Sequence, residues 1–164
     1  MRRRPFDLMR DYNQVLAMHR VSWPLNFPGS PFSEPAFRSV LTRGQRHGGI
    51  YVYEQGGEIV GWLWLDFGVT REVHVRQIQV AEAHWGEGLG RQIMQDAMTL
   101  CVARGYRVMT LTVTKSNTRA LALYIGLGFT LTQDDGDRQR MQLVLPIPLP
   151  VARNNTVKAD KRGN

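Results

Sequence analysis

Hydrophobic and polar residues follow two different periods along the chain, and the period predicts which segments are helices and which are strands. In four segments, apolar residues recur every three or four positions, which places them on one face of a helix. These predicted helices span residues 12–21, 34–41, 89–103 and 117–125. Asp11 and Ser33 stand immediately before the first two helices and are their predicted N-caps.

Six further segments are rich in β-branched, aromatic and alternating apolar residues, and these predict strands. The predicted strands span residues 50–54, 59–67, 72–80, 106–114, 129–133 and 138–145. Tight turns at residues 55–58 and 134–137 join neighbouring strands as hairpins. Because helices and strands do not alternate strictly, we expect an α+β (mixed α/β) domain rather than a doubly wound one.

Two segments fit neither period. Residues 22–32 contain three prolines together with Trp23 and Phe27, which indicates a segment too broken for a helix and apolar enough to line a cleft. After the last predicted strand, alternating prolines end the sheet because they lack the N–H donor. We therefore predict one domain over residues 1–145 and a proline-containing, basic, mobile tail over residues 146–164.

Composition places the charge of the chain at its two ends. The 164 residues are typical of one domain, and their formal net charge is +7. Seven of the 21 lysines and arginines, but only one of the 14 acidic residues, lie in residues 2–4 and 151–164. The body is therefore nearly neutral and does not favour a nucleic-acid partner. The basic ends alone could hold phosphates, through salt-dependent attraction.

The cysteine content and the absence of long apolar runs favour a cytoplasmic protein. The single cysteine, Cys101, excludes an intramolecular disulfide and is expected to be buried and inert. The basic first residues lead into Asp7 and Arg10 rather than an apolar run, so no secretory signal is expected. The sequence contains no unbroken run of about 18 apolar residues, so no membrane span is expected. The four histidines and Cys101 lack metal-ligand spacing, so no metal is expected.

A glycine-rich segment joins the strand that ends at Val80 to the helix that begins near Leu89. Its three alternating glycines are Gly86, Gly88 and Gly90. Glycine lets the backbone approach a ligand, and the first N–H groups of a helix are free, so this segment is a candidate phosphate site. A dinucleotide fingerprint and a nucleoside-triphosphate loop are excluded, because Arg91 replaces a glycine and no lysine precedes Lys115. A connecting turn without a ligand is the alternative.

A second segment, Asn117–Phe129, combines a helix start with a phenol on the same face. Asn117 follows a strand, where it can cap the helix and offer its amide to a ligand. Tyr124 lies two helical turns later and shares that face. The alternative for Tyr124 is a core position, packed under Phe129.

Together the two segments resemble the signature motifs of the GNAT acetyltransferase superfamily, in the expected order. The first motif is the coenzyme A loop, Gln/Arg-x-x-Gly-x-Gly/Ala, in which Gly88 and Gly90 match and Trp85 departs. The second, Asn-x-x-Ala-x-x-x-Tyr-x-x-x-Gly-Phe, matches from Asn117 at every named position. The resemblance covers roughly residues 5–145. It implies a central mixed, mostly antiparallel sheet of about seven strands, flanked by about four helices.

The resemblance further implies an N-acetyltransferase that uses acetyl-CoA, without a metal, to acetylate a primary amine of a small molecule or peptide by direct attack. Tyr124 would protonate the departing thiolate. The implied cofactor-binding residues are Ile78, Gln79, Val80, Trp85, Gly86, Glu87, Gly88, Leu89, Gly90, Arg91, Asn117 and Tyr124. Because Trp85 replaces a polar residue, binding of the pyrophosphate would rest on backbone N–H groups, helped by Arg91, and would be weaker than is typical.

The strand 72–80 holds the candidate bases. Glu72 and His74 share one of its faces because side chains alternate along a strand. In the family this strand often carries a glutamate base, so we favour Glu72, with His74 next because imidazole titrates near neutral pH. Both can instead be solvated residues without a catalytic role. Thr112 stands where acetyltransferases of ribosomal-protein N-termini carry a glutamate, which disfavours that activity.

The amine acceptor is expected to bind at residues 22–32. The candidate contacts are Trp23, Asn26, Phe27 and Phe32, with core packing as the alternative for the aromatic residues. Trp62 and Trp64 are expected in the core. A non-catalytic acyl-CoA-binding or sensing module is the alternative function, suggested by Trp85 and by the uncertain base. The sequence identifies neither the amine nor the choice between monomer and homodimer.

Overall fold

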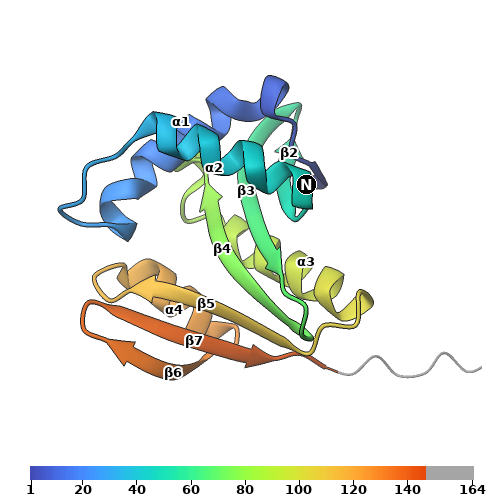
Figure 1. Cartoon of the computed structure of the whole chain (residues 1–164), viewed down its shortest axis with the longest axis vertical. Coiled ribbons are helices and arrows are strands. Elements are labelled where there is room, and N and C mark those ends of the chain that lie inside the picture. Colours follow the sequence, from blue (N-terminus) through green and yellow to red (C-terminus); the bar gives the residue numbers. More distant parts are fainter. Residues whose placement is uncertain (147–164) are drawn as a thin grey trace, which may run out of the picture.

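A single seven-stranded sheet forms the centre of the protein. The computed structural model describes residues 1–146. In these residues the strand order is β1-β2-β3-β4-β5-β7-β6, and every neighbouring pair is antiparallel except β4 and β5 (Figure 1). Four α-helices accompany the sheet. The expected α+β fold with a mixed, mostly antiparallel sheet is therefore confirmed. The predicted tail lies outside the described residues, apart from Pro146.

Most predicted elements are present within a few residues of their expected bounds. The strands are β1 (Arg2–Pro5), β2 (Ile50–Gln55), β3 (Glu58–Phe67), β4 (Glu72–Val80), β5 (Val108–Thr114), β6 (Thr130–Asp135) and β7 (Arg138–Val144). The helices are α1 (Leu8–Asn26), α2 (Glu34–His47), α3 (Leu89–Ala103) and α4 (Thr118–Gly126), with one 3₁₀ turn, η1 (Glu82–His84). Ser33 caps α2 as predicted, through a hydrogen bond from the Ala36 amide.

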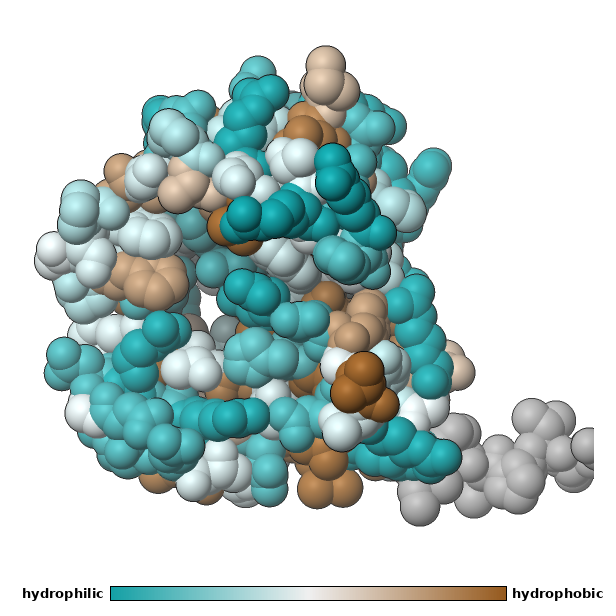
Figure 2. Space-filling model, in the orientation of Figure 1, coloured by the Kyte–Doolittle hydropathy of each residue, from teal (hydrophilic) through white to brown (hydrophobic). Residues whose placement is uncertain are grey.

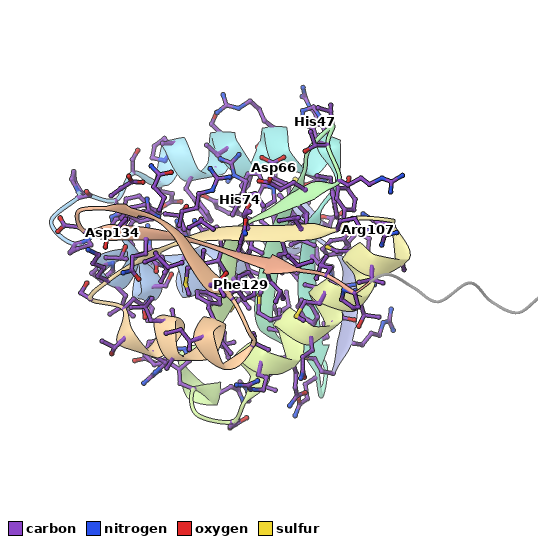
Figure 3. All side chains as sticks on the ribbon, turned by 90° about the horizontal axis from the view of Figure 1, so that it is seen from below. His47, Asp66, His74, Arg107, Phe129 and Asp134 are labelled. Carbon is purple, nitrogen blue, oxygen red and sulfur yellow. The ribbon has the colours of Figure 1, made fainter. Side chains whose placement is uncertain are left out.

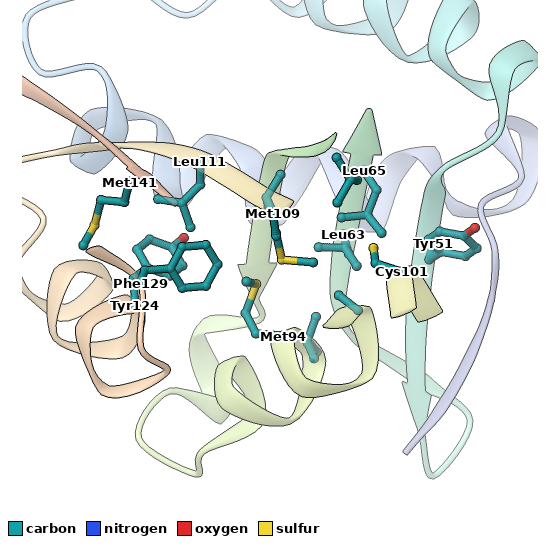
Figure 4. Packing of buried hydrophobic residues seen from close by; sticks show 14 of the residues in the cluster. Tyr51, Leu63, Leu65, Met94, Cys101, Met109, Leu111, Tyr124, Phe129 and Met141 are labelled. Carbon is teal, nitrogen blue, oxygen red and sulfur yellow. The ribbon is translucent and has the colours of Figure 1, made fainter. Parts of the chain in front are cut away.

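Each face of the sheet has its own apolar core. The core shared by α1, α2 and the sheet includes Val15, Leu41, Val52, Trp62 and Trp64. The core under α3 and α4 includes Leu63, Met94, Cys101 and Leu111 (Figure 4). The predicted burial of Cys101 and of both tryptophans of β3 is confirmed. The sheet is thus covered on both faces, and a functional cleft must open between its layers or between its strands.

The first helix begins earlier than the sequence pattern indicated, so the assignment of Asp11 as an N-cap is wrong. The N-cap is Asp7, whose carboxylate accepts hydrogen bonds from the amides of Met9 and Arg10. Asp11 is fully buried in the first turn. Burial alone would raise the pKa of Asp11, but hydrogen bonds from Arg4 and from the Asp7 amide hold it below its usual value. Asp11 therefore anchors the chain before the helix rather than starting the helix.

The same helix also ends later than expected. Residues 22–26, interpreted as too broken for a helix, form its last turn. Pro24 lacks one helical hydrogen bond, but the amide of Phe27 closes the turn onto the Trp23 carbonyl at 2.8 Å. The Trp23 ring lies 4.3 Å from the Phe27 ring and 5.3 Å from the Phe32 ring, centroid to centroid. Aromatic packing therefore outweighs the weak helical propensity of this turn.

The N-terminal arginines form a strand that the sequence analysis did not predict. Arg2–Pro5 forms the edge strand β1, which pairs antiparallel with β2. The Arg4 guanidinium donates two hydrogen bonds to Asp11, at 2.6 and 2.8 Å, and one to Glu54 at 2.7 Å. Arg3 binds a carboxylate of α3. The pattern gave no sign of this strand because its side chains are charged, and their partners are distant in sequence.

The two parallel strands stay together over only four residues. β4 and β5 pair from Glu72 to Val75, after which Arg76 bulges out of register with β3. Beyond the bulge, β4 follows β3 as far as Val80, whereas β5 follows β7 as far as Thr114. The strands therefore part, and the sheet opens between them (Figure 1).

Replacing Arg4 tests the buried ion pair that fixes β1 to α1. We expect Arg4→Gln to lower the free energy of unfolding by about 3 kcal/mol, because it leaves the buried Asp11 carboxylate with only the more distant Arg10, at 3.7 Å, as a charged partner. The measurement is urea unfolding, with Arg2→Gln as the control. Arg2 is exposed, so this control should stay within about 0.5 kcal/mol of wild type. Equal stability of the two variants would contradict the anchoring role.

Candidate active site

The parting of β4 and β5 produces a cleft. Figure 2 shows the surface hollowed between the α1–α2 layer and the strands β5, β7 and β6. The predicted site residues lie around this opening, on the end of α1, on β4, in the loop after β4 and on α4. Two depressions of about 400 and 390 Å³ lie elsewhere, on the outer face of α2 and beside β1 and β2. They contain none of the predicted site residues.

The glycine loop after β4 exposes the first amides of α3. Gly86 and Gly88 have φ angles of 87° and 79°, in the left-handed region that favours glycine. Gly88 is the N-cap, no side chain caps the helix, and the first helical bond runs from the Gln92 amide to the Gly88 carbonyl at 3.2 Å. A Cβ at Gly86 or Gly88 would meet open space. The loop therefore presents free N–H groups at the positive end of a helix to an approaching anion.

Trp85 is turned back onto β4 and carries a cation on its outer side. Its indole N–H donates to the Val80 carbonyl at 2.9 Å. The Arg119 guanidinium, from α4, lies 4.7 Å from the centre of the Trp85 ring. Sequence reasoning missed Arg119, although its position two residues after the motif asparagine put it on the helix that packs beside the loop.

The other charged residues of the loop turn away from it. Arg91, expected to help bind a pyrophosphate, instead donates to the Gly126 carbonyl at 3.1 Å. Glu87 contacts the His84 imidazole at 3.0 Å. The hydrogen bond to Gly126 uses one nitrogen of the Arg91 guanidinium, and the part of Arg91 in binding a pyrophosphate stays a prediction.

Asn117 connects the loop side of the cleft to the end of α1. Its side-chain oxygen accepts from the Ala120 amide at 3.2 Å, so it caps α4, and its amide group donates to the Asn26 side chain at 3.1 Å. The Asn26 carbonyl accepts from the Thr114 hydroxyl at 2.6 Å. The end of α1 is thereby fixed against β5 and α4. The oxygen of the Asn26 side chain accepts the hydrogen bond from Asn117, so its NH₂ group remains free to donate a hydrogen bond to a ligand.

Tyr124 combines a buried ring with a hydroxyl that has no hydrogen-bond partner among residues 1–146. The residue is 8% exposed, and its ring packs 5.8 Å from the Phe129 ring, centroid to centroid (Figure 4). Among residues 1–146, the polar side-chain atoms that are both sealed from solvent and unpartnered are Arg107 Nη1 and Arg138 Nε. The Tyr124 hydroxyl donates to and accepts from no group among residues 1–146, so it is available for a ligand that reaches it. Burial raises the pKa of Tyr124 to about 12.

Glu72 and His74 lie together on the face of β4 opposite the α3–α4 core, and the Thr110 hydroxyl of β5 joins them. In Figure 3, His74 lies on the side of the sheet toward α2 and Phe129 on the side toward α4. The Thr110 hydroxyl lies 2.9 Å from His74 Nδ1 and 3.3 Å from a Glu72 oxygen. Glu72 also pairs with Arg140 at 3.1 Å. Burial, with the charges of Arg140 and Arg76, lowers the pKa of His74.

The Thr110 contacts define the tautomer of His74. A carboxylate only accepts hydrogen bonds, so the single hydroxyl proton of Thr110 points to Glu72. The hydroxyl oxygen must then accept from His74 Nδ1–H. In neutral imidazole this leaves the lone pair on Nε2, which has no partner among residues 1–146. His74 is therefore held with a free basic nitrogen.

A buried histidine of α1, not singled out from the sequence, packs between α2 and the β4 side chain of Gln79. His19 is 2% exposed and stacks on Phe37 with ring centroids 4.0 Å apart. Gln79 accepts from the Trp62 indole at 2.6 Å, so its NH₂ group faces His19 Nδ1 at 2.8 Å. Burial lowers the pKa of His19 to about 4, against the opposing effect of the Gln79 hydrogen bond. The Gln79 side chain thus supports α1 rather than the loop.

The remaining predicted residues divide between the two sides of the sheet. Ile78 and Val80 pack against the α3–α4 core, which leaves only their main chain for a ligand. Trp23 and Phe27 are half-buried at the end of α1, and the Trp23 indole donates to the Ser30 carbonyl at 2.7 Å. Their contact with an amine acceptor stays a prediction.

Comparison with known proteins agrees with this geometry. A family model described as the acetyltransferase (GNAT) family matches residues 12–129, which is most of the chain. The chain belongs to the GNAT acetyltransferase family. Membership of this family implies acyl transfer from acetyl-CoA and confirms the resemblance seen in the two motifs. None of the curated proteins matches the chain significantly.

Solved structures share the GNAT fold at low sequence identity. PaiA N-acetyltransferase of Thermoplasma acidophilum, in complex with coenzyme A, is 16% identical with a TM-score of 0.69, covering 88% of this chain and 99% of its own. Ard1 of Thermoplasma volcanium is 19% identical with a TM-score of 0.73, covering 88% and 97%. A Bacillus subtilis acetyltransferase in complex with coenzyme A is 20% identical with a TM-score of 0.68, covering 88% and 99%.

Two further observations concern residues 1–146 of this GNAT protein. No helix in that range has the length and apolarity needed to cross a membrane. In the same range, no three histidine, cysteine, aspartate or glutamate side chains are grouped so as to hold a metal ion.

Acid titration tests the buried, neutral state of His19. Because its folded pKa is about 4 and its unfolded pKa about 6.5, the unfolded chain binds an extra proton between these values. Stability should therefore be complete above pH 6.5 and fall by about 3 kcal/mol as the pH drops to 4. Urea unfolding at a series of pH values should show that the free energy of unfolding falls less steeply with decreasing pH in His19→Gln than in wild type. His47→Gln, at an exposed site, should retain the wild-type slope; a wild-type slope in His19→Gln would contradict the assignment.

Proposed function

We propose that this GNAT protein is an N-acetyltransferase that transfers an acetyl group from acetyl-CoA to a primary amine of a small molecule or peptide by direct attack. The observation that carries the proposal is a convergence at the parted strands. The free amides of the glycine loop, the unpartnered hydroxyl of Tyr124 and the free nitrogen of His74 come from the elements that border the opening, namely α3, α4 and β4. These are an anion site, an acid and a base, the groups that the reaction requires.

The glycine loop fits the pyrophosphate of the coenzyme. The amides at Gly88, Leu89 and Gly90 provide hydrogen bonds, and Arg119 on the Trp85 ring provides positive charge. The main chain of Ile78–Val80 lies beside the opening, where it can bind the pantetheine arm. We expect the capping residue Asn117 to order the α4 end of the site. Arg119 offsets the loss of a polar side chain at Trp85, so we no longer expect unusually weak binding.

His74 is the better candidate for the base, ahead of Glu72. The Glu72 carboxylate is engaged by Arg140 and by the Thr110 hydroxyl, whereas His74 Nε2 is free. Because the pKa of His74 is lowered, the imidazole is neutral at physiological pH and ready to accept a proton. Glu72 acts as a positioning residue that orients His74 through Thr110.

Tyr124 assists the departure of the thiolate. As the C–N bond forms and the C–S bond breaks, His74 accepts the amine proton and Tyr124 donates to the sulfur. With a pKa of about 12, the phenol is protonated throughout the physiological range. Complete transfer to a thiolate of pKa about 8.5 is uphill by about 5 kcal/mol. Most of the benefit therefore comes from the hydrogen bond to the developing charge, and solvent restores the proton balance after release.

Removal of the phenol separates chemistry from binding. Tyr124→Phe should lower kcat about 100-fold, because the sulfur loses its donor, while the KM for acetyl-CoA changes less than about twofold. The measurement is thiol release with acetyl-CoA and a panel of amines. Equal losses of turnover and coenzyme binding would contradict the acid role. Binding of acetyl-CoA without turnover of any amine would indicate an acyl-CoA-binding or sensing module instead.

Two variants of β4 distinguish the base from its positioning residue. His74→Gln should lower kcat/KM about 100-fold or more. It should also remove the loss of activity expected of wild type in acid, which lies below the ordinary imidazole range because the pKa of His74 is lowered. Glu72→Gln retains a hydrogen-bond acceptor for Thr110, so its kcat/KM should fall by about tenfold at most. The loss of activity in acid should remain as in wild type. The reverse ranking of the two variants would assign the base to Glu72.

A further inference from the structure

The floor of the cleft on β5 and β7 is polar and rich in hydrogen-bond donors. Residues opposite each other in an antiparallel pair share one face of the sheet. The pairs on the cleft face are Thr110–Gln142, Thr112–Arg140 and Thr114–Arg138. His74 pairs with Thr110 across the parallel ladder, so the proposed base lies at one end of this floor. Arg138 lies at the other end, beside the end of α1.

The guanidinium of Arg138 has no hydrogen-bond acceptor for its N–H groups within the described residues. None of the N–H groups of its guanidinium has a hydrogen-bond partner among residues 1–146, and its Nε is sealed from solvent. Its guanidinium lies 5.1 Å from the centre of the Phe27 ring, which holds it at the edge of the cleft. Arg140, by contrast, already pairs with Glu72. The two Nη groups of Arg138 are not sealed and also have no acceptor among residues 1–146, so they are available to an acceptor from outside the chain.

The neighbouring carboxylates do not neutralise Arg138. Asp135 is its cross-strand partner on β6, but Asp135 accepts from Gln133 at 2.7 Å and forms no ion pair with Arg138 within 4.0 Å. Asp134 is paired with Lys115 at 2.6 Å. The positive charge at this end of the floor is therefore uncompensated within the described residues.

We propose that Arg138 binds an anionic group, a carboxylate or a phosphate, on the amine acceptor. The proposal rests on the proposed N-acetyltransferase function and names its substrate class. Thr110 and Thr114 mark the two ends of the floor and are four residues apart, or about 13 Å along a strand. The acceptor is accordingly an elongated one, with its amine at His74 and its anion several bonds away at Arg138. A free α-amino acid is too short to reach both.

Matched acceptors test this assignment by changing only the charge. We compare 6-aminohexanoate with 6-aminohexanamide, and include glycine and an aminoalkylphosphonate, in the thiol-release assay with the full chain. Wild type should show a kcat/KM about 10- to 100-fold higher for the carboxylate than for the amide, because a charged hydrogen-bond pair is lost with the amide. The carboxylate and phosphonate arms identify which anion is preferred. Glycine, which is too short to reach both ends of the floor, should show no such advantage over 6-aminohexanamide.

Variants then assign the preference to Arg138. Arg138→Gln should abolish the advantage of 6-aminohexanoate while leaving turnover of 6-aminohexanamide within about twofold, and Arg138→Lys should restore part of it. Arg43→Gln, on the exposed part of α2, is the matched control and should behave as wild type. Equal rates for the matched acceptors in wild type, or a preference that survives in Arg138→Gln, would overturn the proposal.

A binding measurement separates this proposal from the proposed function. If no amine is turned over, the N-acetyltransferase function fails, and the anion site is tested by thermal denaturation with hexanoate and with hexanamide. Stabilisation of wild type by hexanoate alone, lost in Arg138→Gln, would support an anion site at Arg138. Equal shifts in the two proteins, or none in either, would overturn it.

Discussion

The early parting of β4 from β5 is the constraint on which the rest of the site depends. A parallel pair that continued for the full length of both strands would close the sheet and leave no cleft. The pairing instead stops at Val75, and the Arg76 bulge directs the second half of β4 along β3 alone. The glycine loop, the end of α1 and the start of α4 then meet around the opening. The contacts of Asn26 with Thr114 and Asn117 fix the far side of the cleft, so its width is set by hydrogen bonds between distant segments.

The same strand places apolar and chemical groups on opposite faces. Val73 and Val75 of β4 pack into the core with Tyr124, whereas Glu72 and His74 face the cleft. The imidazole of His74 and the phenol of Tyr124 therefore both lie close to the apolar core. That position explains the direction of both pKa shifts: burial disfavours the charged form of the imidazole and of the phenolate alike. Burial is thus the largest cause of a neutral His74 and a protonated Tyr124 at physiological pH, and the charges of Arg140 and Arg76 add to it at His74.

Much of the fold and the positions of the two motifs could be predicted from the sequence, because they depend on local periodicity and on fixed spacings. The predictions failed where distant contacts decide the outcome. β1 has no apolar alternation and is held by Arg4 with Asp11 and Glu54, and the last turn of α1 forms despite Pro24 because Trp23 packs on Phe27. Within the site, the orientation of Arg91, the position of Arg119 and the Thr110 bridge to His74 depend on side-chain contacts that no spacing along one segment encodes.

The central claim is that one opening between β4 and β5 brings together the coenzyme, the base and the acid. The most direct measurement is a crystal structure of the full chain with a bisubstrate analogue that joins coenzyme A to an elongated amine. The account predicts the pyrophosphate on the amides of Gly88–Gly90, the sulfur within hydrogen-bonding distance of the Tyr124 hydroxyl, and the amine nitrogen beside His74 Nε2. A coenzyme bound elsewhere, or a sulfur out of reach of Tyr124 with the amine beside Glu72, would contradict it.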